Sequence, residues 1–378
     1  MLPVLIGFPC GTRVGGAEQM LWTLLRNRDE VGIAPHVLLL QDGAFRTELE
    51  AEGIPATVIE PGRFREPWKL AGAIAQTARL IRETRPALCI SWLPRVQTVL
   101  APAAAMTGNA RRVVYFEWEL PRGMINRAAV ALPCRWVVAC SSSVLAANQA
   151  MLPHRDGTTV WPGIPAPAHS SPARLGELRA ALGLGDRPVV GVVGRLVGWK
   201  GQDKLIRAAA QLRAQGIDVD VLVVGGETHG VEAGIDDRLH RLAAETGMSE
   251  RVHFTGHVQE PLPYIEIMDV FVSASDGEPF GIVLLEAMAL EIPVVAVAKG
   301  GPVDIVEHGV SGWLVPTNEP DDLASGIGPL LADQRLRARI ASGGLGRYRD
   351  AFREERMLAD LRRTLQGLAQ EIDGAALA

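Results

Sequence analysis

Short apolar runs alternate with longer segments of helical spacing along the whole 378-residue chain. One early run, VLIGF, precedes GGAEQMLWTLLRNR, and a later run, PVVGVVG, precedes KGQDKLIRAAAQLRAQG. Apolar runs of four to eight residues are typical of buried strands, and apolar residues every three or four positions are typical of helices that cover a sheet. Because the two patterns alternate, the sequence predicts an α/β protein with parallel sheets and crossover helices.

The alternation stops at Trp161 to Ala173, where proline, glycine and serine dominate, and then starts again. A chain of this length is also about twice a typical domain. We predict two doubly wound, Rossmann-like domains that face each other across a cleft, at residues 1–165 and 173–352, with a linker at 166–172. Residues 353–378 are predicted to hold a final helix that could cross back to the first domain. Ligands of such sheets bind at the carboxyl ends of the strands, so the strand-to-helix turns are the candidate sites.

Composition is that of a folded soluble protein, with 48% hydrophobic and 21% charged residues. The longest apolar stretches, such as VLAPAAAM, are far shorter than the roughly 20 residues of a membrane-spanning helix. The amino terminus lacks the basic start and cleavage site of a secretory signal, which predicts a cytoplasmic location. The cysteines are too widely spaced for a zinc site and are predicted to be reduced packing residues: Cys10, Cys89, Cys134 and Cys140.

Charge is divided unevenly between the two halves. Residues 1–165 carry 17 basic and 13 acidic side chains, whereas residues 166–378 carry 21 and 30. A basic half and an acidic half suggest different ligands. The basic excess is too small and too dispersed for nucleic acid.

The turn VVGRLVGWKG brings two cations to the end of one predicted strand. Gly194 ends the apolar run, Arg195 follows, and Lys200 stands before the next helix. Converging cations predict an anion, and long basic side chains suit a diphosphate. The glycine spacing differs from the G-x-G-x-x-G fingerprint, which disfavours a dinucleotide-dependent dehydrogenase. The alternative is a pair of solvated surface charges.

The stretch EPFGIVLLEAMA places Glu278 in a loop and Glu286 in the second turn of an apolar helix. The first amides of that helix, near Gly281 and Ile282, lack intrahelical partners and favour a phosphate. A carboxylate among apolar residues is costly unless it accepts hydrogen bonds, and Glu286 could accept two from a ribose diol. Glu278 could accept from sugar hydroxyls. The alternative places both glutamates in solvent.

These stretches carry a resemblance. GGAEQ, GRLVGWKGQDKLIRAAA, RVHFTGHVQE, EPFGIVLLEAMA and GGPVDIVEHGVSGWLVP resemble the retaining GT-B glycosyltransferases of family 4. The match covers nearly the whole carboxy-terminal domain and rests mainly on the glycine-rich turn in the amino-terminal domain. The resemblance implies a GT-B fold and a nucleotide-diphosphate sugar, with UDP or GDP, bound mostly by the second domain.

The resemblance also implies a role for each matching position. Arg195, Lys200 and Glu278 are expected to be catalytic in the second domain. The implied donor site comprises Gly194, Arg195 and Lys200 at the diphosphate, Glu286 at the ribose, Glu278, Phe280, Gly281 and Ile282 at the sugar and phosphate, His257 and Val258 at the base, and Gly15 and Gly16 over the phosphates and beside the acceptor.

The acceptor side departs from the family. A histidine followed by an acid is usual at the end of one first-domain strand, and here VVYFEWELPRG aligns Trp118 with the histidine and Glu119 with the acid. Glu117 or Glu119 could orient or deprotonate the acceptor hydroxyl, with Trp118 stacked on a sugar ring. A buried strand end is the alternative for these three residues.

Departing diphosphate charge is expected to be stabilised by Arg195, Lys200 and the helix start at Gly281, without a metal or a cofactor. The aspartates of Asp218-Val219-Asp220 have the form of a metal motif, but they precede their strand and so lie at the wrong end of the sheet. The predicted function is transfer of a hexose to a hydroxyl of a glycan, lipid-linked or small-molecule acceptor. The alternatives are a catalytically silent nucleotide-sugar-binding protein and a nucleotide-sugar epimerase.

The helix predicted around Pro67 to Arg85 admits two interpretations. It carries Lys69, Arg79 and Arg82, is flanked by Arg63 and Arg65, and has a narrow apolar stripe at Ala71, Ile74, Ala78 and Ile81. A plain sheet-covering helix is favoured. The alternative is peripheral contact with the inner face of a membrane.

Overall fold

The computed structural model describes residues 1–12, 15–62, 66–121, 123–227 and 232–375. Arg63 and Arg65, which flank the predicted surface helix, lie outside the described residues. The chain forms two compact units. Unit one is Met1–Pro162 with Glu354–Ala378, and unit two is Gly163–Arg353. Unit one is thus built from two stretches that are far apart in the sequence.

Unit one contains a seven-stranded parallel sheet in the order β3-β2-β1-β4-β5-β6-β7. Two strands flank β1, as in a doubly wound sheet whose order turns back at the first strand. The strands are β1 Leu2–Phe8, β2 Ile33–Leu39, β3 Ala56–Val58, β4 Leu88–Trp92, β5 Val113–Glu117, β6 Trp136–Ala139 and β7 Gly157–Thr159.

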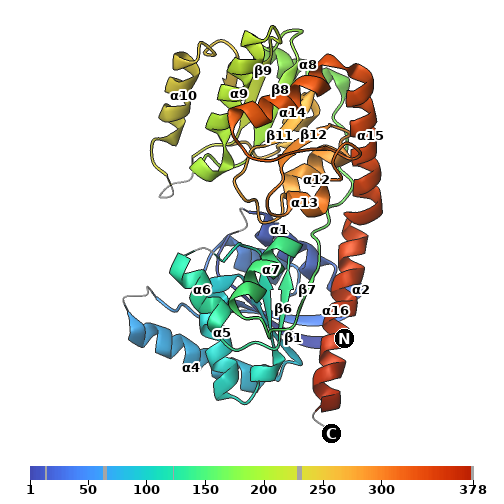
Figure 1. The fold of residues 1–378 in the computed structure, drawn as a ribbon. Helices are drawn as coiled ribbons and strands as arrows, with labels where there is room; N and C mark the ends of the chain where they lie inside the picture. The colour runs from blue at the N-terminus through green and yellow to red at the C-terminus, as the bar shows by residue number, and fades with distance from the viewer. Residues whose placement is uncertain (13–14, 63–65, 122, 228–231, 376–378) are drawn as a thin grey trace. The chain divides into compact units, whose positions relative to one another are not determined.

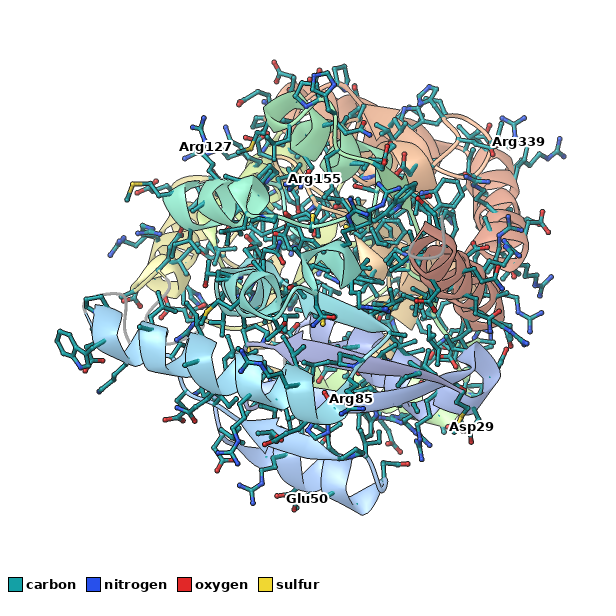
Figure 2. The ribbon with its side chains drawn as sticks, turned by 90° about the horizontal axis from the view of Figure 1, so that it is seen from below. Asp29, Glu50, Arg85, Arg127, Arg155 and Arg339 are labelled. Carbon is teal, nitrogen blue, oxygen red and sulfur yellow. The ribbon has the colours of Figure 1, made fainter. Side chains whose placement is uncertain are left out.

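Helices cover both faces of this sheet. Successive side chains of a strand point to opposite faces, so Leu5 and Cys89 contact the side formed by α4 and α5. The helices of unit one are α1 Gly16–Arg26, α2 Arg28–Val31, α3 Ala44–Ala51, α4 Pro67–Thr84, α5 Pro94–Met106, α6 Gly123–Ala131, α7 Ser142–Met151 and α16 Glu354–Ala375, with the 3-10 turn η1 Ala110–Arg112. Figure 2 shows the charged side chains of Asp29, Glu50 and Arg127 on the outside of this unit.

Helix α4 buries Ala73, Ala78 and Ile81 in the core of unit one, whereas Ala71 of the predicted stripe is exposed. Arg85 ends the helix in the left-handed region with φ 45°. Helix α4 packs against the sheet, as the favoured interpretation of this segment predicts. No helix within the described residues is long and apolar enough to cross a bilayer.

The last helix, α16, belongs to unit one, where it packs against α2 and η1 (Figure 1). Two ion pairs hold its carboxy-terminal end: Arg112 meets Asp373 at 3.2 Å, and Arg135 pairs with Glu371. Its side chains Met357 and Leu361 are buried. The helix, Glu354–Ala375, lies within the segment 353–378 that was predicted to hold a final helix.

Unit two contains a six-stranded parallel sheet in the order β10-β9-β8-β11-β12-β13. Its strands are β8 Val189–Val193, β9 Asp220–Val224, β10 Val252–Phe254, β11 Val270–Ser273, β12 Val294–Val297 and β13 Trp313–Val315. Its helices are α8 Pro172–Ala181, α9 Gln202–Ala214, α10 Ile235–Glu245, α11 Leu262–Glu266, α12 Ile282–Ala289, α13 Pro302–Ile305, α14 Pro320–Ala332 and α15 Gln334–Ala351, with the 3-10 turn η2 Gly198–Lys200.

The valine-rich strands of unit two form a core with α9, α10 and α14. Val190, Val221 and Leu323 are fully buried there. Buried parallel strands read as continuous apolar runs, which is why the sequence revealed them. The prediction of an α/β protein with two parallel sheets is confirmed.

Candidate active site

The turn after β8 carries both predicted cations, Arg195 and Lys200. Gly194 has φ 151°, and its amide donates to the Val224 carbonyl at 2.9 Å, which fixes the turn to β9. The Arg195 side chain is exposed, while its carbonyl accepts a hydrogen bond from Nε2 of the buried Gln202 at 2.9 Å. The backbone at Arg195 is therefore anchored, and the guanidinium lies at the surface.

Lys200 lies five residues on and has a defined partner. Its Nζ is 2.6 Å from Oε2 of Glu278, and both side chains are largely buried, at 17% and 13% exposure. The Oγ of Ser275 donates to the same oxygen at 2.8 Å. The structure thus brings together two residues, 78 positions apart, that the sequence assigned to the diphosphate and to the sugar.

Glycines allow the loops at this edge of the sheet to touch. A Cβ at Gly201 would lie 2.2 Å from the Ala274 carbonyl oxygen, and one at Gly301 would lie 2.2 Å from Cα of Phe280. The amide of Gly301 donates to the Glu278 carbonyl at 2.8 Å. Because real Cβ contacts are never so short, these backbones approach as closely as they do only through glycine. The Glu278 loop is therefore locked by its neighbours.

Helix α12 begins directly after that loop. Gly281 precedes its first residue with φ 109°, in the left-handed region that favours glycine. Phe280 is 4% exposed and anchors the turn, and the first amides of the helix have no intrahelical acceptor. An anion is favoured at such a position by the amide dipoles.

Glu286 lies one turn into α12 and keeps some solvent exposure. Loss of hydration on burial raises the pKa of this carboxyl to about 7. Its carboxyl oxygens make no hydrogen bond or ion pair with any other described residue, although Leu284 and Leu285 beside it are buried. A carboxylate in that position has unused acceptor capacity, which a pair of hydroxyls could fill.

The predicted base residues follow β10 at the same edge. Gly256 has φ 65°, and its carbonyl accepts from the Gly225 amide at 3.1 Å. A Cβ at Gly226 would lie 3.0 Å from the His257 amide nitrogen. His257 is exposed and Val258 is half-buried. Their backbone therefore lies beside the turns after β8 and β9, as the carboxyl ends of parallel strands require.

In unit one, Gly15 and Gly16 stand at the amino end of α1 and are exposed. A Cβ at Gly15 would lie 2.5 Å from Oε2 of Glu18. Residues 13 and 14, which belong to the same glycine-rich turn, lie outside the described residues. The α1 amino end carries exposed backbone with no side chain at two successive positions, which is compatible with close approach of a ligand.

Glu117 ends β5 and is fully buried. Burial raises the pKa of its carboxyl to about 8, with the opposing effect of the nearby Tyr115 hydroxyl smaller than that of desolvation. Neither carboxyl oxygen makes a hydrogen bond of good geometry with a described residue. Glu117 therefore lies in the interior, in the manner of the buried strand end that was the alternative for this segment.

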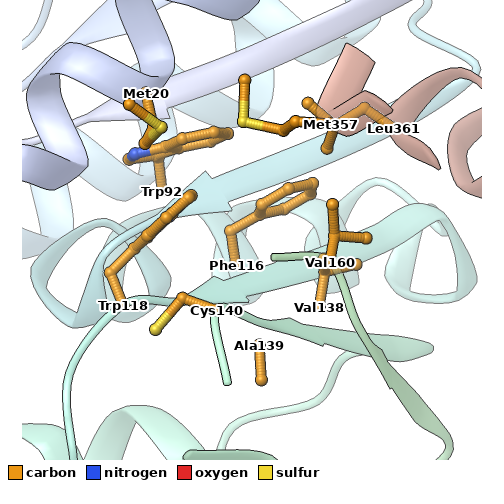
Figure 3. A pocket seen from close by; sticks show the side chains of 10 residues that line it. All are labelled: Met20, Trp92, Phe116, Trp118, Val138, Ala139, Cys140, Val160, Met357 and Leu361. Atoms are coloured by element: carbon orange, nitrogen blue, oxygen red, sulfur yellow. The ribbon is translucent and has the colours of Figure 1, made fainter. Parts of the chain in front are cut away.

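Trp118 and Glu119 continue from β5 toward the surface. Phe116, Trp92 and Trp118 form an aromatic stack, with ring centroids 4.7 Å and 5.0 Å apart. Figure 3 shows these rings around an apolar pocket of unit one, with Met357 and Leu361 of α16 beside Trp92 and Phe116. Glu119 is exposed, and its Oε2 accepts from Nδ2 of Asn126 at 3.0 Å. Of the three acceptor-side candidates, Glu119 has the accessible carboxylate.

Sequence reasoning missed several residues near these two edges. In unit one, Glu18 and Arg95 act, together with the predicted Glu119, on Cys10, whose pKa is raised mainly by burial. In unit two, Ser275 and Trp199 contact the Lys200 and Glu278 pair. The available signal was position alone: Ser275 precedes Glu278 by three residues, and Trp199 directly precedes Lys200.

Both aspartates of the Asp-x-Asp segment pair with arginines. Asp220 begins β9, is fully buried and accepts from Nε of Arg187 at 3.1 Å, while Asp218 accepts from Arg251 at 3.2 Å. Across the described part of the chain no group of three or more His, Cys, Asp or Glu side chains could hold a metal ion. All four cysteines are free thiols.

Comparisons with known proteins agree with this architecture. A crystal structure of Anabaena Alr3699/HepE in complex with UDP and glucose is 29% identical, with TM-score 0.84, over 97% of this chain and 100% of that chain. The two parallel sheets and this likeness define a GT-B fold.

Residues 176–345 match the family described as glycosyl transferases group 1. The GDP-mannose-dependent alpha-(1-6)-phosphatidylinositol monomannoside mannosyltransferase of Mycolicibacterium smegmatis is 39% identical over 46% of each chain. The D-inositol 3-phosphate glycosyltransferase of Stackebrandtia nassauensis is 38% identical over 50% of this chain and 44% of its own length. The chain spans about half the length of the curated relatives it matches. The domain at 176–345 is therefore the part of the chain that matches the glycosyl transferases group 1 family.

Proposed function

We propose that this protein is a retaining glycosyltransferase that moves a hexose or related sugar from a nucleotide-diphosphate sugar to an acceptor hydroxyl. One observation carries the proposal. At a single edge of the second sheet, the Lys200 and Glu278 pair, the open amino end of α12 and the unpaired Glu286 carboxylate gather on turns locked by glycines. Lys200 and the α12 amides match a diphosphate, Glu278 matches a sugar, and Glu286 matches a ribose.

In the proposed reaction, the bond between the anomeric carbon and the diphosphate oxygen breaks, and its electron pair stays on the diphosphate. The acceptor oxygen bonds to the anomeric carbon on the same face of the sugar and gives up its proton. Lys200, Arg195 and the α12 amides neutralise the growing negative charge, so the step needs no metal. Donors of this kind typically contribute about 3 kcal/mol each to transition-state stabilisation.

The other donor contacts follow from the same placement. Glu286 accepts from the ribose hydroxyls, Glu278 from the sugar, and the backbone of His257 and Val258 meets the base. UDP and GDP are the proposed nucleotides. HepE was crystallised with UDP and glucose, and the mycobacterial relative is named for GDP-mannose.

On the acceptor side, Glu119 is the proposed group that orients the hydroxyl or takes its proton, with Trp118 beside it as a surface for a sugar ring. We expect Glu119→Ala to lower the rate of transfer strongly while donor affinity stays normal. Full activity in that variant would remove Glu119 from the mechanism. The acceptor remains a glycan, a lipid-linked sugar or a small molecule.

The test is a thermal-shift series with UDP-, GDP- and ADP-sugars, because a true donor stabilises the folded state by mass action. Transfer or hydrolysis of the stabilising donor is then measured with and without excess chelator. A silent nucleotide-sugar-binding protein would be stabilised without turnover, and an epimerase would change the sugar without releasing nucleotide. Loss of transfer in chelator would overturn the metal-free mechanism.

The cytoplasmic location predicted from the sequence, with contact at the inner face of a membrane as its extension, stays a prediction.

A further inference from the structure

The Lys200 ammonium and the Glu278 carboxylate are held by two residues that no motif assigned. Trp199 lies under the ammonium, with Nζ of Lys200 4.5 Å from the centroid of its ring. Ser275 is 4% exposed, and its hydroxyl donates to Oε2 of Glu278 at 2.8 Å. Each charged group therefore has a second partner besides the other charged group.

The two oxygens of Glu278 are not equivalent. Oε2 accepts from both Lys200, at 2.6 Å, and Ser275. Oε1 makes no hydrogen bond with any residue in the described ranges. The protein thus fixes one oxygen and leaves the other to accept from a ligand, as a carboxylate with two acceptor oxygens can.

The backbone holds the same arrangement. The Trp199 carbonyl accepts from the Asp276 amide at 2.8 Å, which joins η2 to the turn that precedes Glu278. Gly201, just after Lys200, touches the Ala274 carbonyl so closely that a Cβ there would lie 2.2 Å from its oxygen. Ammonium and carboxylate are therefore presented from two loops that cannot easily separate.

We propose that Trp199 and Ser275 are positioning residues of the donor site, Trp199 for Lys200 and Ser275 for Glu278. This inference rests on the proposed function. When a diphosphate competes for the ammonium, the tryptophan face keeps Lys200 in place through a cation–π contact. When Lys200 turns toward the diphosphate, the Ser275 hydroxyl still holds Oε2, so that Oε1 remains aimed at the sugar.

The two roles predict different patterns of binding. Trp199 acts on the diphosphate, which a nucleoside diphosphate and a nucleotide sugar share. Ser275 acts on the sugar, which only the nucleotide sugar has. For Ser275, a purely structural role would weaken both ligands together. For Trp199, whose positioning role also weakens both ligands, a purely structural role would lower the melting temperature and would not be relieved by keeping an aromatic ring at this position.

The experiment uses the full chain and titration calorimetry with UDP, GDP, UDP-glucose and GDP-mannose, together with kcat and KM for whichever sugar is turned over. Trp199→Leu should weaken the bound nucleoside diphosphate about 3- to 30-fold, and Trp199→Phe, which keeps a ring, should recover most of that loss. Ser275→Ala should leave nucleoside diphosphate affinity unchanged while kcat/KM falls about 10- to 100-fold. Ser275→Thr, which keeps the hydroxyl, should recover part of the activity.

Matched controls come from the same unit. Ser311 is buried and its hydroxyl accepts from the Glu307 amide, and the Trp313 ring contacts the His308 ring at 4.8 Å between centroids. Ser311→Ala and Trp313→Leu should leave both affinities and kcat unchanged, whatever they do to the melting temperature.

If the wild-type protein binds UDP or GDP, either of two results would show that the positioning roles are wrong while the proposed function stands. In the first, Trp199→Leu and Ser275→Ala behave like the controls. In the second, Ser275→Ala loses both ligands equally and Trp199→Phe recovers none of the affinity that Trp199→Leu loses. If the wild-type protein binds neither nucleotide nor either sugar form, the proposed function is overturned, and this inference with it.

Discussion

The carboxyl ends of the strands in the two sheets carry different kinds of side chains. At the edge in unit two, charged groups are paired, and glycine contacts fix the loops that carry them. At the edge in unit one, aromatic rings in contact lie beside the buried Glu117 carboxyl group, which has no hydrogen-bond partner of good geometry among the residues that the structure describes. The first arrangement is preorganised for a charged ligand. The second buries the Glu117 carboxyl group next to aromatic rings, so it identifies no ligand by itself.

The largest effect on activity is expected from substitution of Lys200, whose ammonium pairs with Glu278 in unit two. Lys200→Met removes the charge proposed to stabilise the leaving diphosphate and should lower kcat about 100- to 1000-fold, or about 3 kcal/mol. Steady-state transfer rates measure it. Lys204→Met is the control, because Lys204 lies on α9 and pairs with Glu319 at 2.9 Å, outside the Glu278 loop. Equal rates for the two variants would contradict the assignment of Lys200.

The glycine contacts of unit two come next. Gly301→Ala would place a Cβ 2.2 Å from Cα of Phe280, so the Glu278 loop must move. Overpacking of this kind costs about 1–3 kcal/mol of stability, and we expect activity to fall further than stability does. Denaturant unfolding and transfer rate measure the two effects.

Gly346→Ala is the matched control for that substitution. A Cβ at Gly346, inside α15, meets no atom within 4 Å. Alanine there should raise stability by up to about 1 kcal/mol and leave transfer unchanged. A Gly301→Ala protein with normal kcat would show that the loop tolerates displacement.

The buried carboxyl of unit one gives a pH test of stability. The pKa of Glu117 is raised by burial to about 8, so the folded state holds this proton after the unfolded state has released it near its ordinary value of about 4.5. Stability should therefore fall as pH rises from about 4.5 to 8 and stay low above that range. Glu117→Gln lacks this loss, so it should match the wild type at pH 5 and exceed it at pH 9 by on the order of 4 kcal/mol.

Urea unfolding followed by circular dichroism at pH 5, 7 and 9 measures that difference. Glu60→Gln, at an exposed position of the same unit, is the control and should show no such divergence. Parallel curves for Glu117→Gln and the wild type would mean that Glu117 is ionised and solvated in the folded protein.

The smallest expected effect concerns Glu286 in unit two. Its pKa is raised by burial to about 7, and only the ionised carboxylate can accept from both ribose hydroxyls. Affinity for the nucleotide sugar should therefore rise up to about tenfold from pH 6 to pH 8 and level off above pH 7. Titration calorimetry of wild type and Glu286→Gln measures it. A slope that survives in the variant would belong to another group.

How much the sequence could predict differs between the two edges for a physical reason. Strands such as Val189–Val193 are continuous apolar runs, and the Arg195, Lys200 and Glu278 pattern has a fixed spacing along the chain. Such local signals predicted both sheets and the donor candidates. Helices α8 and α15 were not predicted, since α8 buries none of its residues and α15 interrupts its apolar face with glycines.

The partners of the charged pair could not be predicted, because they depend on contacts between loops. Ser275 and Trp199 are ordinary residues in the sequence, and only the fold brings them to Glu278 and Lys200. Glu117 reads as a polar strand end, whereas the packing of its neighbours buries it completely. In unit one, the property that distinguishes Glu117 is its burial, and neither composition nor local sequence reveals burial.

Helix α16 has a consequence for synthesis of the chain. Met357 and Leu361 complete the wall beside Trp92 and Phe116, yet a ribosome makes every residue of 163–353 before it reaches them. Residues 1–162 are therefore synthesised with an apolar surface that α16 does not yet cover. A released polypeptide that ends at residue 353 should therefore contain a folded unit two and a unit one whose uncovered apolar face binds chaperones.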